Sequence, residues 1–193
     1  MFYEIEARSH VRVSPSDFTE EPKKAILKRL SEQFTNFVSK NIGIAIGVTE
    51  VISIGDGVII PGDGAAYYDT VYKLLIFKPE LQEVVHGTLT EIADFGAFIN
   101  LGPIDGMIHI SQTMDDYVSF SKVGVLTGKE TKKVLKVGDK CRARIIAISH
   151  KEIQNPKIGL TMRQPSLGAL TWIEEELKKQ KKEKKEAKAE KKK

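Results

Sequence analysis

The sequence contains one cysteine, Cys141, among its 193 residues. A single thiol cannot form a disulfide within the chain, so a disulfide scaffold is excluded. The four histidines, His10, His86, His109 and His150, are scattered and have no cysteine or acidic companions at the spacing of zinc ligands. We therefore expect no metal site and no cofactor.

Long apolar runs are also missing. No stretch reaches the roughly 18 residues that a membrane-spanning helix needs, and residues 1–4 lack the basic start and apolar run of a signal peptide. We expect no membrane association and a cytoplasmic location.

The net charge of +4 is unevenly distributed along the chain. Residues 178–193 contain ten lysines and three glutamates and contribute +7, so the remaining residues carry −3. A lysine-rich tail is typical of a solvated segment, and weak attraction to nucleic acid is a second reading that stays open.

The first half of the chain has the hydrophobic pattern of a small α+β domain. Apolar residues at every second position predict a strand over 3–13. Thr19 is a candidate helix cap, and apolar residues at helical spacing predict about five turns that end between Asn41 and Gly43. Strands are expected at 44–54, 57–60 and 67–77.

The sequence Lys78-Pro79-Glu80 interrupts this pattern and predicts a domain boundary. Beyond it, five short strands at 84–93, 97–101, 106–110, 140–149 and 157–162 predict a barrel. The long connection 111–138 is expected to be functional or mobile, and a helix is expected to begin near Leu170. The predicted organisation is a docking domain at 1–79, a barrel at 80–165, and a C-terminal helix with the lysine-rich tail at 166–193.

No catalytic or nucleotide-binding motif is complete. Gly57 and Gly62 have the spacing of a phosphate-binding loop, but Asp63 stands where the lysine should be. The acidic pair Asp115-Asp116 has no third acid at metal-site spacing, and we interpret it as a loop pair. We expect no enzymatic activity and no small-molecule substrate.

The barrel contains the most specific motif. Residues 86–99 read HGTLTEIADFGAFI and residues 101–111 read LGPIDGMIHIS. This sequence closely resembles the ribosomal S-one-type RNA-binding domain, over roughly residues 82–163. The resemblance implies a five-stranded OB-fold and single-stranded RNA binding, with the positions of Phe95, Phe98 and His109 on the nucleic-acid surface.

Physical chemistry alone leaves alternatives at these positions. Gly96 permits a sharp bend, and exposed rings stack on any base, but phenylalanines in strands also simply fill barrels. Further along the chain, Arg142, Arg144 and Lys157 are either phosphate contacts or part of a solvated strand face.

The first half of the chain indicates which of the proteins with an S-one-type domain this sequence resembles. Residues 54–68 read IGDGVIIPGDGAAYY, and they resemble the tip domain of the E-prime subunit of archaeal RNA polymerase and its eukaryotic seventh-subunit counterpart. Residues 115–117 and 160–165 also resemble that E-prime protein. Local chemistry predicts only connected hairpins here; the resemblance adds an RNP-like tip that docks on the polymerase core through Gly55, Asp56, Gly57, Pro61, Gly62, Asp63 and Gly64.

The resemblance implies a non-catalytic stalk subunit of an archaeal-type DNA-directed RNA polymerase. It would pair with the polymerase's F subunit, dock on the core subunits, hold nascent single-stranded RNA and assist DNA opening in initiation and later elongation. The alternative is an S-one-domain component of translation initiation or of the RNA exosome, which does not explain the glycine-rich tip. A nuclease would need clustered acids or a histidine pair that the sequence lacks.

Overall fold

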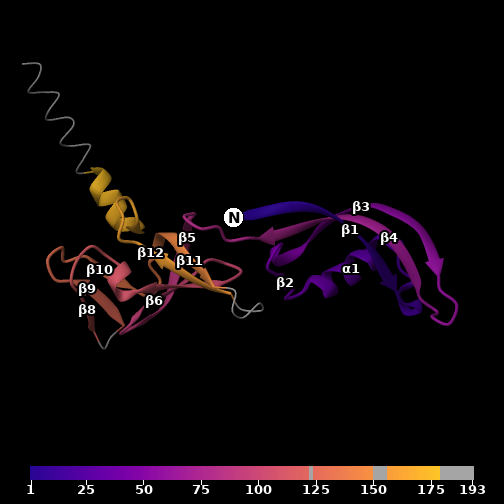
Figure 1. Cartoon of the computed structure of the whole chain (residues 1–193), viewed down its shortest axis with the longest axis horizontal. Helices are drawn as coiled ribbons and strands as arrows, with labels where there is room; N and C mark the ends of the chain where they lie inside the picture. Colours follow the sequence, from indigo (N-terminus) through magenta and orange to yellow (C-terminus); the bar gives the residue numbers. More distant parts are fainter. Residues whose placement is uncertain (122–123, 150–155, 179–193) are drawn as a thin grey trace, which may run out of the picture. The chain divides into compact units, whose positions relative to one another are not determined.

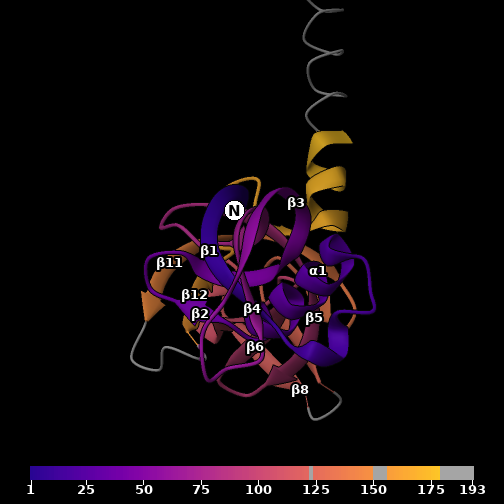
Figure 2. The ribbon, with the colours of Figure 1, turned by 90° about the vertical axis from the view of Figure 1, so that its right-hand side faces the viewer.

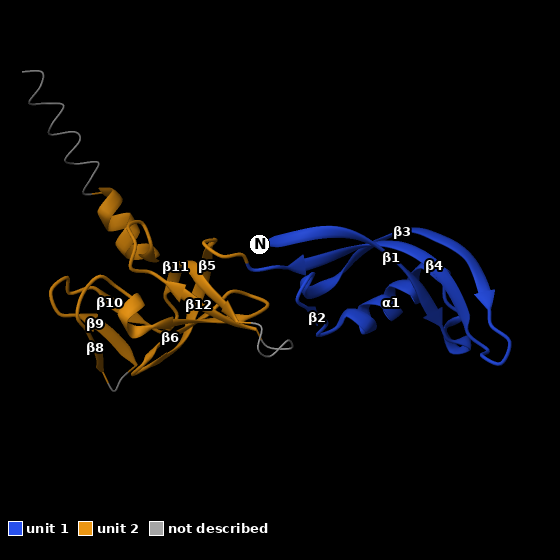
Figure 3. Cartoon of the chain, viewed as in Figure 1, with its two compact units in different colours: residues 1–79 blue, residues 80–193 orange. Residues whose placement is uncertain are grey.

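The computed structural model describes residues 1–121, 124–149 and 156–178, and the expectations for the lysine-rich tail fall largely outside this range. The chain divides into two compact units, Met1–Pro79 and Glu80–Lys193 (Figure 3). Within the described ranges, every helix is too short or too polar to cross a bilayer.

The first unit is a curved antiparallel sheet with one helix (Figure 1). The strand order is β1-β4-β3-β2, with β1 at Phe2–Val13, β2 at Val38–Ser39, β3 at Gly43–Ile59 and β4 at Ala66–Phe77. A short 3-10 helix, η1 (Pro15–Asp17), and the helix α1 (Pro22–Phe34) connect β1 to β2. This is the predicted order of strand, helix and strands.

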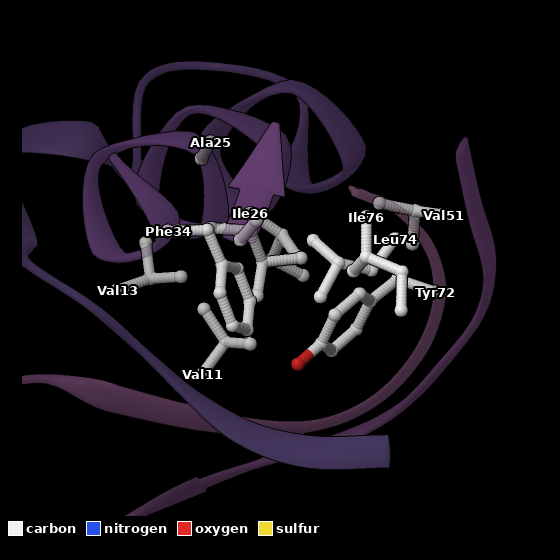
Figure 4. Close-up of a cluster of buried hydrophobic side chains, with 11 residues drawn as sticks. Val11, Val13, Ala25, Ile26, Phe34, Val51, Tyr72, Leu74 and Ile76 are labelled. Atoms are coloured by element: carbon white, nitrogen blue, oxygen red, sulfur yellow. The ribbon is translucent and has the colours of Figure 1, made fainter. Parts of the chain in front are cut away.

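Apolar side chains of α1 and of three strands form one core (Figure 4). The helical spacing of Ala25, Ile26, Leu30 and Phe34 places these residues on one face, and all are buried. They pack against alternate residues of the sheet. The sheet contributes Val11, Val13, Ala45, Val51, Tyr72, Leu74 and Ile76.

The helix and the strands of this unit both differ from the expectations. The helix ends at Phe34 after 13 residues, because Thr35 is extended and Asn36 adopts a positive φ of 56°, which an α-helix does not accept. Its N-cap is Glu21 rather than Thr19, and no side chain caps it.

The second difference concerns the strands. Residues 43–59 form one strand, not two, and it stays paired with β4 through four register shifts. One shift lies between Ile54 and Gly57, so Gly55 and Asp56 form a bulge where the sequence predicted a turn. A bulge bends a strand without ending its pairing, and turn-forming residues alone do not distinguish the two.

The second unit contains a closed five-stranded barrel, as expected. Its strands are β5 (Val84–Ala93), β6 (Gly96–Asn100), β7 (Asp105–His109), β11 (Lys140–Ser149) and β12 (Lys157–Thr161). They follow the order β12-β7-β6-β5-β11, and pairing between β11 and β12 closes the barrel. The short strand β13 (Gly168–Ala169) adds to β11.

The long connection carries secondary structure that the sequence analysis did not predict. After a 3-10 helix, η2 (Ile110–Gln112), three antiparallel strands form a small sheet: β8 (Val118–Ser121), β9 (Val125–Gly128) and β10 (Val134–Lys136). Leu126 and Leu135 face each other across β9 and β10 and are fully buried.

Residues 170–178 are helical, as expected from Leu170 onward (yellow in Figure 2). Trp172 and Ile173 are buried. The ammonium group of Lys133 lies 5.4 Å from the centre of the Trp172 ring and 2.8 Å from a carboxylate oxygen of Glu176. A cation–π contact and an ion pair therefore join this helix to the segment before β10.

Candidate nucleic-acid interface

Phe95 and Phe98 stand on the outside of the barrel. On β6, Ala97 and Ile99 point inward and are fully buried, so Phe98, between them, faces outward and is half-buried. Phe95, in the turn before β6, is 46% exposed. The two ring centres are 6.0 Å apart at an interplanar angle of 85°, an edge-to-face pair. These rings are therefore not part of the barrel interior.

Gly96 allows β6 and β7 to approach closely beside these rings. A Cβ atom at this position would lie 2.2 Å from the carbonyl oxygen of Ile108. Gly96 pairs with His109, and the amide of Ile110 donates to the carbonyl of Phe95 at 2.9 Å. The missing side chain thus fixes His109 next to the turn that carries Phe95.

The His109 ring is held by the backbone that follows it. Its Nδ1 accepts a hydrogen bond from the amide of Ser111 at 3.3 Å and lies 2.8 Å from the hydroxyl oxygen of that residue. Because Nδ1 acts as an acceptor, the neutral ring carries its proton on Nε2. Nε2 has no partner among the described residues, so the outer edge of the ring is available to a ligand.

The three predicted cations do not all join this cluster. Lys157 is exposed at the start of β12, and the next residue, Ile158, pairs with Gly106 on β7. Arg142 and Arg144 lie on β11, which pairs with β5, β12 and β13 but, within the described ranges, not with β6 or β7. The structure therefore places Lys157 on the strand beside β7 and separates both arginines from the rings.

Met107 is a neighbour of the rings that the sequence analysis missed. It is half-buried on β7 and pairs with Phe98 on one side and with Gly159 on the other. The alternation of β7 places it on the same face as His109. That alternation was present in the sequence and would have identified it.

The predicted docking residues fall in two places: Gly55, Asp56 and Gly57 lie within β3, and Pro61, Gly62, Asp63 and Gly64 lie in the connection between β3 and β4. The amide of Asp63 donates to the carbonyl of Ile60 at 3.0 Å, and Gly62 has a φ of +94°, as the third position of a type II turn requires. Pro61 occupies the second position. Just before this turn, Val58, Ile59 and Ile60 are 60%, 63% and 47% exposed.

Asp63, the last residue of this turn, bonds to residues of β1 and β4. Its two carboxylate oxygens accept hydrogen bonds from Arg12 Nε at 2.9 Å and Nη2 at 2.8 Å. The hydroxyl of Tyr67 donates to the same carboxylate at 2.8 Å, and the amide of Ala65 does so at 3.3 Å. Arg12 and then Tyr67 hold the pKa of Asp63 well below its usual range. Asp63 thus has a structural role within the tip.

The acidic pair proves to be structural as well. Asp115 accepts a hydrogen bond from Arg163 Nε at 2.7 Å, which joins the two later motifs of the family resemblance. Asp116 accepts from the Thr131 amide and hydroxyl, each at 2.8 Å, and these bonds lower its pKa. No group of three potential metal ligands occurs in the part of the chain that is described. Burial raises the pKa of Cys141 to about 12, so its thiol stays protonated at neutral pH.

Comparison with known protein families finds a match for each half of the chain. Residues 8–64 match the model of the SHS2 domain found in the N terminus of Rpb7p, Rpc25p and MJ0397, and residues 78–152 match that of the S1 RNA binding domain.

Curated relatives match most of the chain. The DNA-directed RNA polymerase subunit Rpo7 of Saccharolobus solfataricus is 38% identical over 175 residues, covering 90% of this chain and 97% of the relative. The Rpo7 of Sulfolobus acidocaldarius is 36% identical, covering 94% of this chain and all of the relative. The polymerase III subunit rpc8 of Schizosaccharomyces pombe is 33% identical over 49% of this chain and 47% of its own length.

Proposed function

Because the chain belongs to the family of the DNA-directed RNA polymerase subunit Rpo7, we propose that it is a stalk subunit that holds nascent single-stranded RNA outside the polymerase core. The relatives are named as polymerase subunits over almost the whole length of this chain. A translation initiation or exosome component is therefore disfavoured. The chemistry of transcription belongs to the assembled enzyme, and this subunit serves as an accessory.

The observation that carries the RNA-binding role is the exposed pair of Phe95 and Phe98 beside His109. Aromatic faces stack on unpaired bases with little sequence preference, and each base contributes about 1–3 kcal/mol. Such contacts suit a strand that moves as the transcript grows. Lys157, on the neighbouring strand, supplies a phosphate contact, whereas Arg142 and Arg144 have a weaker claim because β11 is not paired with β6 or β7.

The docking role rests on the apolar run at the end of β3. Three consecutive exposed apolar residues, Val58, Ile59 and Ile60, are unusual on a free surface and mark a protein contact. The turn through Pro61 and Gly62 presents this run, and the Arg12–Asp63 pair stiffens it. The occupant is the polymerase core. By family resemblance, the polymerase's F subunit is the second partner, the assembled stalk favours DNA opening, and the complex works in the cytoplasm.

The RNA-binding proposal is tested by changing Phe95, Phe98 and His109 together to alanine in the full-length chain. Loss of two stacking rings is expected to weaken binding of a uridine decamer by about tenfold or more, measured by fluorescence anisotropy. Phe120→Ala is the matched control, because this ring is 39% exposed on β8, which belongs to the separate sheet of β8, β9 and β10, and its loss should leave affinity unchanged. Unaltered affinity in a folded triple variant would remove the proposed surface.

A further inference from the structure

A cleft in this unit adjoins the ring cluster of Phe95, Phe98 and His109 through Ser111. The cleft has a volume of about 490 Å³, within the range of roughly 300–1,000 Å³ typical of small-ligand sites. Its walls come from η2, from the segment between η2 and β8, and from Glu130 and Arg163. Apart from Ile110 and Ser111, none of its lining residues takes part in the RNA surface described above.

Tyr117 is the stacking group of this cleft. Its side chain is 77% exposed, yet its backbone is anchored, because the amide of Lys129 donates to its carbonyl at 2.9 Å. The preceding residue, Asp116, is fixed by Thr131. A large ring on a fixed backbone is a stacking platform, because a base that binds it has only the side chain left to order.

The polar groups of the cleft favour a base over a phosphate. Asp115, Asp116 and Glu130 bring three carboxylates against the single cation of Arg163, and this excess repels phosphate. Hydrogen bonds to Thr131 and to the Glu130 amide occupy Asp116. Three groups remain available to bind a base: the Glu130 carboxylate, the second oxygen of Asp115, and the Nη groups of Arg163. The Arg163 Nη groups have no partner within the described ranges.

The cleft also continues the path of the ring cluster. Ser111 lines it, and the same residue contacts His109 through both its amide and its hydroxyl. A strand that stacks on Phe95 and Phe98 and passes His109 is therefore directed toward the cleft.

We propose that this cleft binds one unpaired guanine of the RNA, an inference that rests on the RNA-binding function proposed above. The base stacks on Tyr117. Guanine presents two adjacent donors, N1–H and the 2-amino group, beside the acceptor O6, whereas adenine and cytosine present one amino group and uracil one N–H. A carboxylate accepts both guanine donors at once, and the guanidinium of Arg163 donates to O6. Glu130 is the carboxylate that is free to do so.

The test uses the full-length chain and three decamers: all uridine, uridine with one central guanine, and uridine with one central inosine, which lacks the 2-amino group. The guanine decamer is expected to bind at least about fivefold more tightly than the other two, as a bidentate base contact implies. Tyr117→Ala and Glu130→Gln should each abolish that preference, whereas Phe120→Ala, whose ring is not among the residues that line the cleft, should keep the preference and leave affinity for the uridine decamer unchanged. Tyr117→Phe, which keeps the ring, should retain the preference.

Equal affinity of the wild type for the three decamers would overturn the guanine site, as would a preference that survives Tyr117→Ala. Binding of an arginine-rich peptide that is lost in Glu130→Gln, without any guanine preference, would assign the cleft to a protein partner. The uridine decamer separates the two proposals, because its affinity depends on Phe95, Phe98 and His109 and not on the guanine contacts of Glu130 and Arg163. A wild type that shows no guanine preference, but whose uridine binding is weakened when Phe95, Phe98 and His109 are changed to alanine, rejects only the cleft.

Discussion

A methyl group added at Gly96 would lie 2.2 Å from the carbonyl oxygen of Ile108 on the neighbouring strand. Ordinary carbon–oxygen contacts between strands are about 3.3–3.6 Å, so Gly96→Ala must push β6 and β7 apart by about 1 Å. The obstacle is backbone and not the end of a flexible side chain. No rotamer change relieves it.

The expected cost follows from two opposing effects. Forcing an extra carbon into a packed site costs about 1–3 kcal/mol, and alanine recovers about 0.5–1 kcal/mol of the entropy that glycine loses on folding. The net loss is about 1–2 kcal/mol. With a urea dependence of about 1–3 kcal/mol per molar for a small domain, the unfolding midpoint should fall by about 1 M.

The chain contains one tryptophan, and Trp172 is buried in the second unit, so its fluorescence reports the unfolding of that unit alone. Gly159→Ala on β12 is the matched control. Its added methyl would lie at an ordinary 3.4 Å from the Cβ of Ala147, and its midpoint should stay at or slightly above that of the wild type. A Gly96→Ala midpoint equal to the wild type, or an equal fall in the control, would refute the close-approach argument.

Two predictions concern the tip. Ile59→Asp places a charge in the exposed apolar run and should prevent co-purification with the polymerase. Ile52→Asp, at a residue that is also exposed on β3, should co-purify normally. Normal incorporation of Ile59→Asp would argue against the docking surface. Asp63 has a depressed pKa in the folded chain, so its ion pair with Arg12 stabilises the fold above the ordinary carboxylate pKa of about 3.9 and is lost as the pH falls through the folded value. Acid unfolding followed by far-ultraviolet circular dichroism should therefore be steeper for the wild type than for Asp63→Asn, and identical slopes would contradict this.

The barrel was predictable because its information is local. The five strands lie within one or two residues of their predicted positions, since inward and outward residues alternate and glycine and proline mark the turns. The turn at Pro61 and Gly62 was predictable for the same reason. The sequence was enough to predict the local structure wherever the backbone preference of a single residue decided it.

The errors share a physical cause as well. Nothing in the glycines around Asp56 distinguishes a bulge from a turn, because both need the same backbone freedom and only the partner strand β4 decides between them. The helix stopped at Phe34 although Phe37 and Val38 continue the helical spacing, because Asn36 adopts a positive φ and Val38 pairs with Ile44 as part of β2. The small sheet of β8 to β10 has strands of three or four residues, too short for a periodicity to be visible.

For the candidate site, the sequence alone determined which residue types are present and that Phe98 and Ile99 face opposite sides of a strand. Only the tertiary structure decided that Phe98 is outside and meets Phe95 edge to face, and that Arg142 and Arg144 lie on a strand that pairs with neither β6 nor β7. It alone brought Arg163 to Asp115, 48 positions apart. A strand's own alternation fixes two faces, but which face is buried, and which distant residues meet it, depends on the closure of the whole barrel.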